Sequence, residues 1–181
     1  MPIRPAEMTD WPGISRLLTQ LEYPGTERFL KTRLTAMLND PAETLLVWAE
    51  PSPASPAENA ASPSAARPAL PAASTAGPAS QPPPPTAGPA SPLILGFLSL
   101  HFIPQIALEA DFARISYFAV DNDARSNGIG RQLEETATRL ARDRGCELIE
   151  VHCHSRRTRA HDFYRRQGYE ESPKYLIKRL K

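Results

Sequence analysis

The segment Arg125-Ser126-Asn127-Gly128-Ile129-Gly130 follows an apolar run that ends at Val120 and precedes an amphipathic helix expected from about Arg131. At a strand-to-helix junction the first N–H groups of the helix lack partners and the helix dipole is positive, which favours an anion. Glycines at 128 and 130 keep side chains away from these N–H groups, and Arg125 adds positive charge. The segment therefore predicts a pyrophosphate-binding loop.

Two commoner phosphate motifs do not fit this segment. The dinucleotide fingerprint needs a third Gly or Ala where the chain has Leu133, and the Gly-Lys-Ser/Thr of a Walker loop is missing from the sequence. What remains is Arg-x-x-Gly-x-Gly, a pattern that an ordinary glycine-rich turn also satisfies. The interpretation as a phosphate loop therefore depends on the rest of the chain.

The composition changes abruptly over residues 51–92. This stretch holds 13 of the 20 prolines, and its only charged residues are Glu58 and Arg67. Such a segment buries too little apolar surface to offset its ordering entropy. We therefore expect residues 1–181 to form a single domain interrupted by a disordered Pro/Ala/Ser-rich hairpin insert at 51–92. A proline-rich ligand for a partner domain is the alternative interpretation.

The charge of the chain is nearly balanced overall but unevenly distributed. A formal net charge of +1 over 181 residues argues against a nucleic-acid partner. From Arg125 onward there are 14 Lys and Arg against 8 Asp and Glu, whereas residues 1–124 hold 7 against 12. A basic half that contains the phosphate loop suits an anionic cofactor, and an acidic half suits an amine-bearing substrate.

Two further features bear on location and assembly. The first residues lack the apolar core of a secretion signal, and no apolar run is long enough to span a bilayer, so we expect a cytoplasmic protein without a membrane partner. Cys146 and Cys153 fall an odd number of positions apart in one expected strand, where they would face opposite ways and could not form a disulfide with each other. The oligomeric state stays open, with a homodimer as one option.

Hydrophobic periodicity predicts an α/β fold: a central mixed sheet with helices on both faces. The expected helices begin at Thr9 or Asp10, at Thr26, near Arg131 (ending by Gly145) and at Thr158 (ending at Gln167). The expected strands are Ile3–Ala6, Thr44–Ala49, Leu93–Phe102, Arg114–Val120, Glu147–His154 and Tyr175–Leu180.

This order of elements, together with three motifs, resembles the GNAT superfamily of acetyl-CoA-dependent N-acetyltransferases over the whole chain except the insert. The motifs are Phe118-Ala119-Val120 followed by 125–131, the strand Leu148-Ile149-Glu150-Val151, and Ala160-x-x-Phe163-Tyr164-x-x-x-Gly168-Tyr169. The resemblance implies the GNAT acyltransferase fold and acetyl-CoA as co-substrate.

The resemblance also implies where acetyl-CoA binds. The backbone of the strand matching Phe118, Ala119 and Val120 is expected to pair with the pantetheine arm, and the loop matching Ser126 to Arg131 is expected to hold the pyrophosphate. The neighbouring parallel strand is expected to diverge from Val120 and leave a cleft for the thioester. Arg157 stands where the superfamily often has a cofactor-binding Asn, and an arginine there could reach a CoA phosphate.

Acetyl transfer to an amine requires a base for the amine and a proton for the departing thiolate. Tyr164 matches the superfamily tyrosine that is proposed as general acid. Glu150 is the expected base, because it interrupts an apolar strand in which burial should raise the pKa of a carboxyl group. In the histone-lysine branch the base aligns with Arg114, which cannot accept a proton, so that substrate class is disfavoured.

Other bases remain open. His152 and His154 share the face of Glu150 by strand alternation, which makes them alternative bases or links in a proton path, and water is a further option. The two histidines lack an evident third ligand, so no metal is expected.

The expected acceptor is a small molecule or a peptide that carries a primary amine. The turn at Leu21–Pro24, the 104–113 loop with Glu109 and Asp111, and the C-terminal strands should line its groove. The acidic residues favour a polyamine or aminoglycoside-like amine; a peptide N-terminus stays open. The competing function is a non-catalytic acyl-CoA-binding or scaffold module that recruits a partner through the insert.

Overall fold

The computed structural model describes residues 2–50, 92–172, 176 and 178–180; the insert predicted at 51–92 lies, apart from Pro92, outside these residues. In these residues, five strands form one sheet in the order β1-β2-β3-β4-β5. Neighbours from β1 to β4 are antiparallel and β5 runs parallel to β4, so the predicted mixed sheet is confirmed. The strands are β1 Ile3–Pro5, β2 Glu43–Glu50, β3 Leu93–Ile103, β4 Phe112–Val120 and β5 Leu148–Val151.

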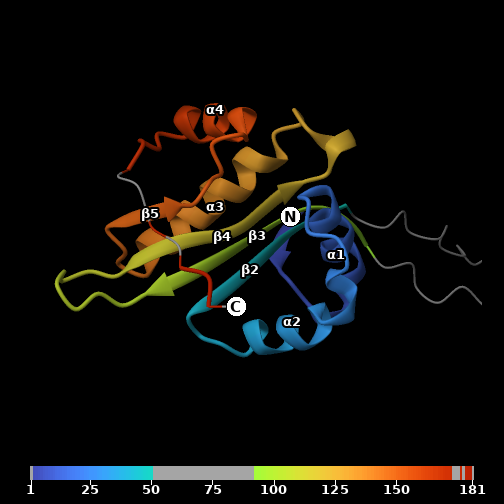
Figure 1. The fold of residues 1–181 in the computed structure, drawn as a ribbon, viewed down its shortest axis with the longest axis horizontal. Helices are drawn as coiled ribbons and strands as arrows, with labels where there is room; N and C mark the ends of the chain where they lie inside the picture. The colour runs from blue at the N-terminus through green and yellow to red at the C-terminus, as the bar shows by residue number, and fades with distance from the viewer. Residues whose placement is uncertain (1, 51–91, 173–175, 177, 181) are drawn as a thin grey trace, which may run out of the picture.

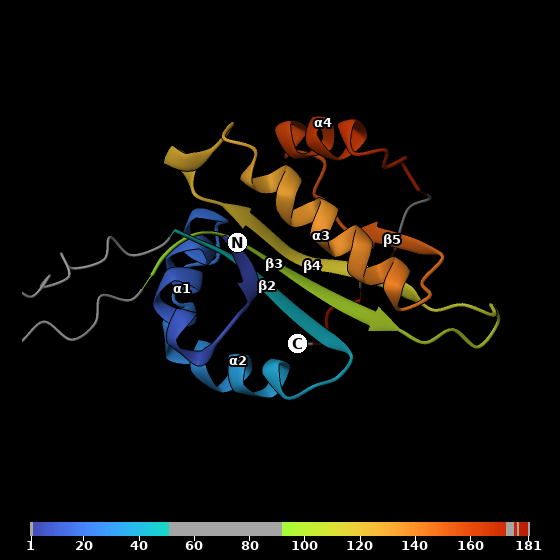
Figure 2. The same cartoon turned by 180° about the vertical axis from the view of Figure 1, so that it is seen from behind.

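Helices cover both faces of this sheet, as predicted (Figures 1 and 2). α1 (Trp11–Gln20) and α2 (Leu30–Leu38) lie on one face, and α3 (Ile129–Asp143) lies on the other with α4 (Thr158–Arg166) beside it. β3 supplies both cores, because successive side chains of a strand point to opposite faces. Phe97 packs toward α1 and α2, whereas Leu98 packs toward α3.

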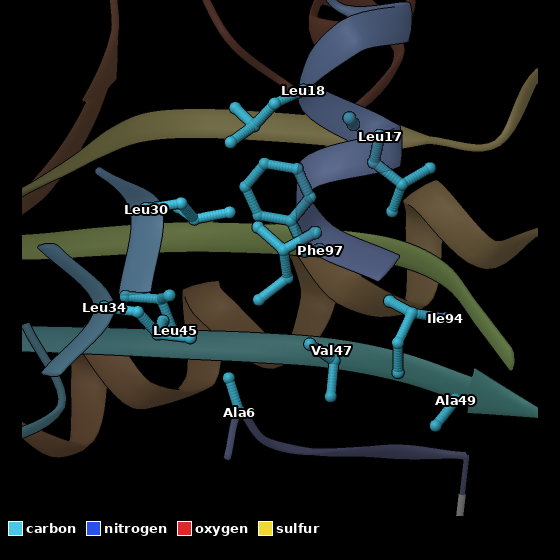
Figure 3. Packing of buried hydrophobic residues seen from close by; sticks show 12 residues of the cluster. Ala6, Leu17, Leu18, Leu30, Leu34, Leu45, Val47, Ala49, Ile94 and Phe97 are labelled. Atoms are coloured by element: carbon cyan, nitrogen blue, oxygen red, sulfur yellow. The ribbon is translucent and has the colours of Figure 1, made fainter. Parts of the chain in front are cut away.

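The core beneath α1 and α2 surrounds Phe97 (Figure 3). Leu17 and Leu18 reach it from α1, and Leu34 reaches it from α2. Leu17 and Leu34 are at most 1% exposed, and burial of such a side chain contributes about 1.5–3 kcal/mol. This packing holds α1 against the end of the sheet where the chain leaves β4.

The pairing of β4 with β5 stops before this end of the sheet; the predicted divergence of the two strands stays a prediction. Their parallel pairing runs from Phe112↔Leu148 to Ile115↔Val151 and then stops. On its other side β4 continues to pair with β3 as far as Val120, across an irregularity in register next to Leu100. Among the described residues, the part of β4 after Ile115 therefore has one open edge. This open edge is the place where an extended ligand could pair with the strand.

Two strand predictions are wrong in extent. β5 begins at Leu148 and ends at Val151, instead of Glu147 and His154, because its pairing with β4 covers only these residues. Cys146, Cys153 and both histidines therefore lie outside the strand, and both cysteines are free thiols. The final strand predicted at 175–180 is also not found where the structure is described: 176 and 178–180 are not in a strand, while 175 and 177 lie outside the described residues. Apolar alternation alone does not make a strand, which needs a neighbouring edge.

The length and hydropathy of the helices bear on whether one of them could cross a membrane. In the described parts of the chain, no helix is both long and apolar enough to cross a bilayer.

Candidate active site

The predicted phosphate loop connects the end of β4 to α3. The helix begins at Ile129, two residues earlier than predicted, so Ile129 and Gly130 lie in its first turn. Ser126 and Gly128 both have left-handed backbone, with φ values of 68° and 79°. Between Arg125 and Arg131, no backbone N–H donates to another backbone group within the described chain. The loop therefore offers a run of unpartnered N–H groups at the positive end of a helix.

The two glycines of the loop have different roles. Gly128 has the left-handed φ that glycine adopts at least cost. At Gly130 an added Cβ would lie 3.5 Å from the ring of Phe163 and 3.6 Å from Val120 Cγ2. Both distances are ordinary van der Waals contacts, so a Cβ at this position would pack against Phe163 and Val120 without a clash. That Gly130 clears space for the ligand stays a prediction.

A buried carboxylate that the sequence analysis did not identify braces the start of this loop. Asp121 is 4% exposed and accepts hydrogen bonds from Arg16, from Gln20 Nε2 at 3.1 Å and from the N–H of Asp123 at 3.0 Å. The Arg16 hydrogen bond is the main cause that lowers the pKa of Asp121. The hydrogen bonds from Arg16 and Gln20, here called the Arg16–Asp121 brace, hold the start of the loop against α1. The only sequence signal was an aspartate directly after an apolar strand.

Tyr164 lies in an aromatic cluster beside the open end of β4. Its ring centroid is 6.4 Å from that of Phe118 on β4, 5.3 Å from Phe163 and 5.2 Å from Tyr169. Burial is the main cause that raises the pKa of Tyr164, with Cys153 and Glu134 adding to it. Within the described residues its hydroxyl makes no hydrogen bond. The phenol is therefore protonated at neutral pH and has a proton to donate.

Glu150 is not in the apolar surroundings that the sequence pattern predicted. The parallel register places it opposite Arg114, and the two side chains form an ion pair. His152 Nε2 lies 3.7 Å from the same Glu150 oxygen. The carboxylate lies one residue before the end of the β4–β5 pairing. It thus remains close to the expected cleft but has a cationic neighbour.

His154 has a different place from the one that strand alternation predicted. Because β5 has already ended, His154 lies in the connection to α4, where its Nδ1 accepts a hydrogen bond from the N–H of Arg156 at 3.2 Å. This hydrogen bond occupies the lone pair of Nδ1, and a role of His154 as base stays a prediction. No cluster of three or more metal-ligand side chains occurs in the described ranges.

Arg157 faces the turn after α1. Its Nη2 donates to the carbonyl of Leu21 at 2.8 Å and lies 3.5 Å from Glu22, which also pairs with Arg156. The neighbouring Tyr23 contacts Tyr117 of β4, with ring centroids 5.7 Å apart. Arg157 is predicted to bind a CoA phosphate. To do so, its guanidinium would have to break its hydrogen bond to Leu21 and move away from Glu22.

The acidic residues predicted to line the acceptor groove lie elsewhere. Glu109 and Asp111 are exposed in the connection between β3 and β4, at the end of the sheet opposite to the phosphate loop (Figure 1). About six residues of extended chain, roughly 20 Å, separate Asp111 from Tyr117. The pattern of charge along the chain could not show at which end of the strand these residues lie.

Comparisons with known proteins agree with the fold described above. Residues 81–169 match the model of the acetyltransferase (GNAT) family. No curated protein sequence matches the chain.

Solved structures share the fold at low sequence identity. Glucosamine-6-phosphate N-acetyltransferase from Arabidopsis thaliana has a TM-score of 0.68 at 16% identity, covering 99% of this chain and 97% of that chain. A GNAT family acetyltransferase from Staphylococcus aureus has a TM-score of 0.65 at 18% identity, covering 99% and 100%. An aminoglycoside acetyltransferase from an uncultured soil metagenomic sample has a TM-score of 0.60 at 20% identity, covering 99% and 95%.

Proposed function

The chain belongs to the acetyltransferase (GNAT) family, and from that premise we propose that it transfers the acetyl group of acetyl-CoA directly to a primary amine within a ternary complex. It is an acetyl-CoA-dependent N-acetyltransferase. The observation that carries the direct mechanism is the placement of an unpartnered N–H loop, an open β4 edge and a protonated Tyr164 at one end of the sheet. Direct transfer needs no covalent enzyme intermediate.

The residues have separate roles in this proposal. The N–H groups of Ser126 to Arg131, with Arg125, bind the diphosphate of the co-substrate, and the backbone of Phe118, Ala119 and Val120 pairs with its pantetheine arm. When bound, acetyl-CoA supplies an activated acetyl thioester. Tyr164 gives its proton to the departing thiolate, and Glu150 takes a proton from the attacking amine. A cofactor contact from Arg157 stays a prediction.

The proposed acceptor is a small primary amine, polyamine or aminoglycoside-like, or a peptide N-terminus. Two structural relatives act, by their names, on an aminoglycoside and on glucosamine 6-phosphate. Near the open end of β4, the turn after α1 supplies Glu22, whose charge is shared with two arginines, and the exposed ring of Tyr23. Glu109 and Asp111 no longer support a preference for polycations. A cytoplasmic location and a homodimer stay predictions.

The test is an acceptor panel with acetyl-CoA: a polyamine, an aminoglycoside, glucosamine 6-phosphate and a short peptide with a free N-terminus. We expect acceptor-dependent release of free thiol together with a product 42 mass units heavier, about one acetyl group in place of a proton. Double-reciprocal plots that intersect support a ternary complex. Parallel plots or an acetylated protein would contradict direct transfer, because they indicate a covalent enzyme intermediate.

Replacing Glu150 with glutamine should lower kcat about 100-fold near neutral pH, because a positioned base typically contributes 10²- to 10⁴-fold. The loss should shrink as the pH approaches the pKa of the acceptor, where the amine loses its proton unaided. The measurement is kcat against pH, with exposed Glu147→Gln as the control. A pH profile of kcat that is unchanged in Glu150→Gln would show that Glu150 is not the base. The same loss of kcat in His152→Gln would then assign that role to His152.

We propose that residues 1–181 form one domain in which the segment 51–92 interrupts a β-hairpin. Glu50 and Leu93 are paired across β2 and β3, so the segment leaves and re-enters the sheet at one point. An Asn-Gly turn in place of 51–92 should leave kcat and KM within about twofold and raise stability by about 2–3 kcal/mol through the shorter loop. Steady-state kinetics and urea unfolding measure this; a folded variant with lost turnover would place the segment in the active site.

A further inference from the structure

Four polar side chains form a row across the sheet, one from each of four neighbouring strands. The register aligns Glu43 with His101, His101 with Arg114, and Arg114 with Glu150. The strand neighbours of His101 and Arg114 all pack in the core beneath α3: Leu100, Phe102, Ala113 and Ile115. Because side chains alternate along a strand, the row lies on the other face of the sheet, which carries α1 and α2.

The helices α1 and α2 leave this part of the face open. The described core beneath them reaches Phe97 on β3 and includes none of the four residues of the row. The side chains of His101, Arg114 and Glu150 are 35%, 37% and 33% exposed. The row is therefore accessible to a small molecule, and it lies beside the open part of β4, which begins after Ile115.

Arg114 has hydrogen-bonding capacity left for a ligand. Its Nε donates to Glu150 Oε1, whereas its Nη1 and Nη2 donate to none of the described residues. Glu43, the other carboxylate of the row, is engaged by His101 Nδ1 at 2.6 Å. The guanidinium lies over the ring of Phe112, with Cζ 5.5 Å from the ring centroid. Arg114 can therefore offer two terminal nitrogens to a carboxylate, which a guanidinium binds with two parallel hydrogen bonds.

Glu150 has the complementary capacity. Its Oε1 accepts from Arg114 and lies 3.7 Å from His152 Nε2, whereas its Oε2 accepts no hydrogen bond from the described residues. The ion pair therefore combines an unengaged carboxylate oxygen with unengaged guanidinium N–H groups. A molecule that carries an ammonium and a carboxylate on the same carbon would satisfy both.

We propose that the Arg114–Glu150 pair binds the acceptor, and that this acceptor is an α-amino acid. Arg114 binds its carboxylate through Nη1 and Nη2, and Glu150 Oε2 binds its ammonium, which places Glu150 to take the proton that the amine must lose. Each charge of the zwitterion then meets an opposite charge, whereas a polyamine would bring a like charge to Arg114. The inference rests on the proposed function and narrows its acceptor.

The surroundings of the pair favour an apolar side chain on this amino acid. On one side of the row lies Phe112, which is aligned with Leu148 of β5, and Leu148 is 47% exposed. On the other side lies Tyr117, which is 40% exposed and contacts the exposed ring of Tyr23. An apolar side chain would remove part of this apolar surface from water.

The test compares L-leucine with L-leucinamide, in which an uncharged amide replaces the carboxylate, and with spermidine as a polyamine. Steady-state kinetics of the full chain with acetyl-CoA give KM, and calorimetry of the protein saturated with coenzyme A gives the affinity. We expect KM and Kd for leucine to be about 10- to 100-fold lower than for leucinamide, the range for hydrogen bonds to charged groups.

Variants of two arginines identify the group that is responsible. In Arg114→Gln the ratio of the two Kd values should fall to about one, and Arg114→Lys, which keeps the charge without the planar fork, should retain part of it. Arg144→Gln is the matched control. Arg144 also lies over a phenylalanine, Phe102, but Phe102 belongs to the core on the opposite face of the sheet. This control should keep the full preference.

The remaining outcomes separate the inference from the proposed function. Equal affinity for leucine and leucinamide, tighter binding of spermidine, no binding of leucine, or a preference that survives in Arg114→Gln would each overturn the inference. Equal turnover of leucinamide would instead favour a peptide N-terminus, since its amide resembles a peptide bond. In all these cases coenzyme A still binds and the proposed function stands. Failure of the wild-type protein to bind coenzyme A would contradict the proposed function itself.

Discussion

Replacing Tyr164 with phenylalanine should lower kcat by about 100- to 1,000-fold, within the range for loss of a positioned general acid. Its phenol is half-buried, is protonated at neutral pH and makes no hydrogen bond to another described side chain. The ring itself packs against Phe118 and Phe163, and phenylalanine preserves these contacts. Acetyl-CoA affinity should therefore stay within about twofold. Thiol release under saturating substrates gives kcat, and calorimetry with coenzyme A gives the affinity.

Tyr169→Phe is the matched control for this experiment. Tyr169 lies in the same aromatic cluster, but its hydroxyl donates to Glu134 on α3. Loss of that hydrogen bond should reduce the free energy of unfolding by about 1 kcal/mol and leave kcat nearly unchanged. Equal losses of kcat in both variants would indicate that cluster packing, and not a proton from Tyr164, is responsible.

Replacing Gly128 with valine should weaken coenzyme A binding at least about tenfold. Gly128 has φ of 79° at the cap of α3, and a residue with a Cβ loses about 1–2 kcal/mol in that conformation. A β-branched residue is expected to move the backbone away from this φ, which turns the adjacent N–H groups away from a common anion. Calorimetry with coenzyme A measures the effect directly.

Gly145→Val separates this effect from general backbone strain. Gly145 follows the other end of α3 with φ of 76°, and no described atom lies within 4 Å of the place a Cβ would take. Both substitutions should lower the free energy of unfolding by about 1–2 kcal/mol. Only Gly128→Val should affect the ligand. Normal coenzyme A binding by folded Gly128→Val would refute the phosphate loop.

Local patterns predicted the elements that depend on neighbouring residues. The apolar face of α3 predicted from Leu133, Ala137 and Leu140 packs on the sheet: Leu133 and Ala137 are 0% exposed, and Leu140 is partly buried. The helix was expected to begin at Arg131 and begins at Ile129, an error of the usual size at a helix end. The strand predicted at Glu147–His154 is present but shorter, at Leu148–Val151. Its length depends on pairing with β4, which the spacing of its own residues does not show.

The candidate site, like the fold, was predictable only where its residues are neighbours in the sequence. The motifs around Gly128 and Tyr164 could be recognised because they are short and contiguous; their roles in binding and catalysis stay predictions. The Arg114–Glu150 ion pair joins residues 36 positions apart, and the Arg16–Asp121 brace joins residues 105 positions apart. No periodic pattern in the sequence predicts a contact between residues that lie so far apart.

The sequence by itself determined the helix and strand order, the left-handed turn at Gly128 and the tyrosine on α4, because backbone conformation and amphipathic spacing act over a few residues. Only the tertiary structure decided that Glu150 has a cationic neighbour, that Asp121 fastens the loop to α1 and that the acidic loop lies at the far end of the sheet. These three contacts and positions depend on strand register and helix packing. Register and packing result from many weak contacts across the whole domain, so no single segment of the sequence determines them.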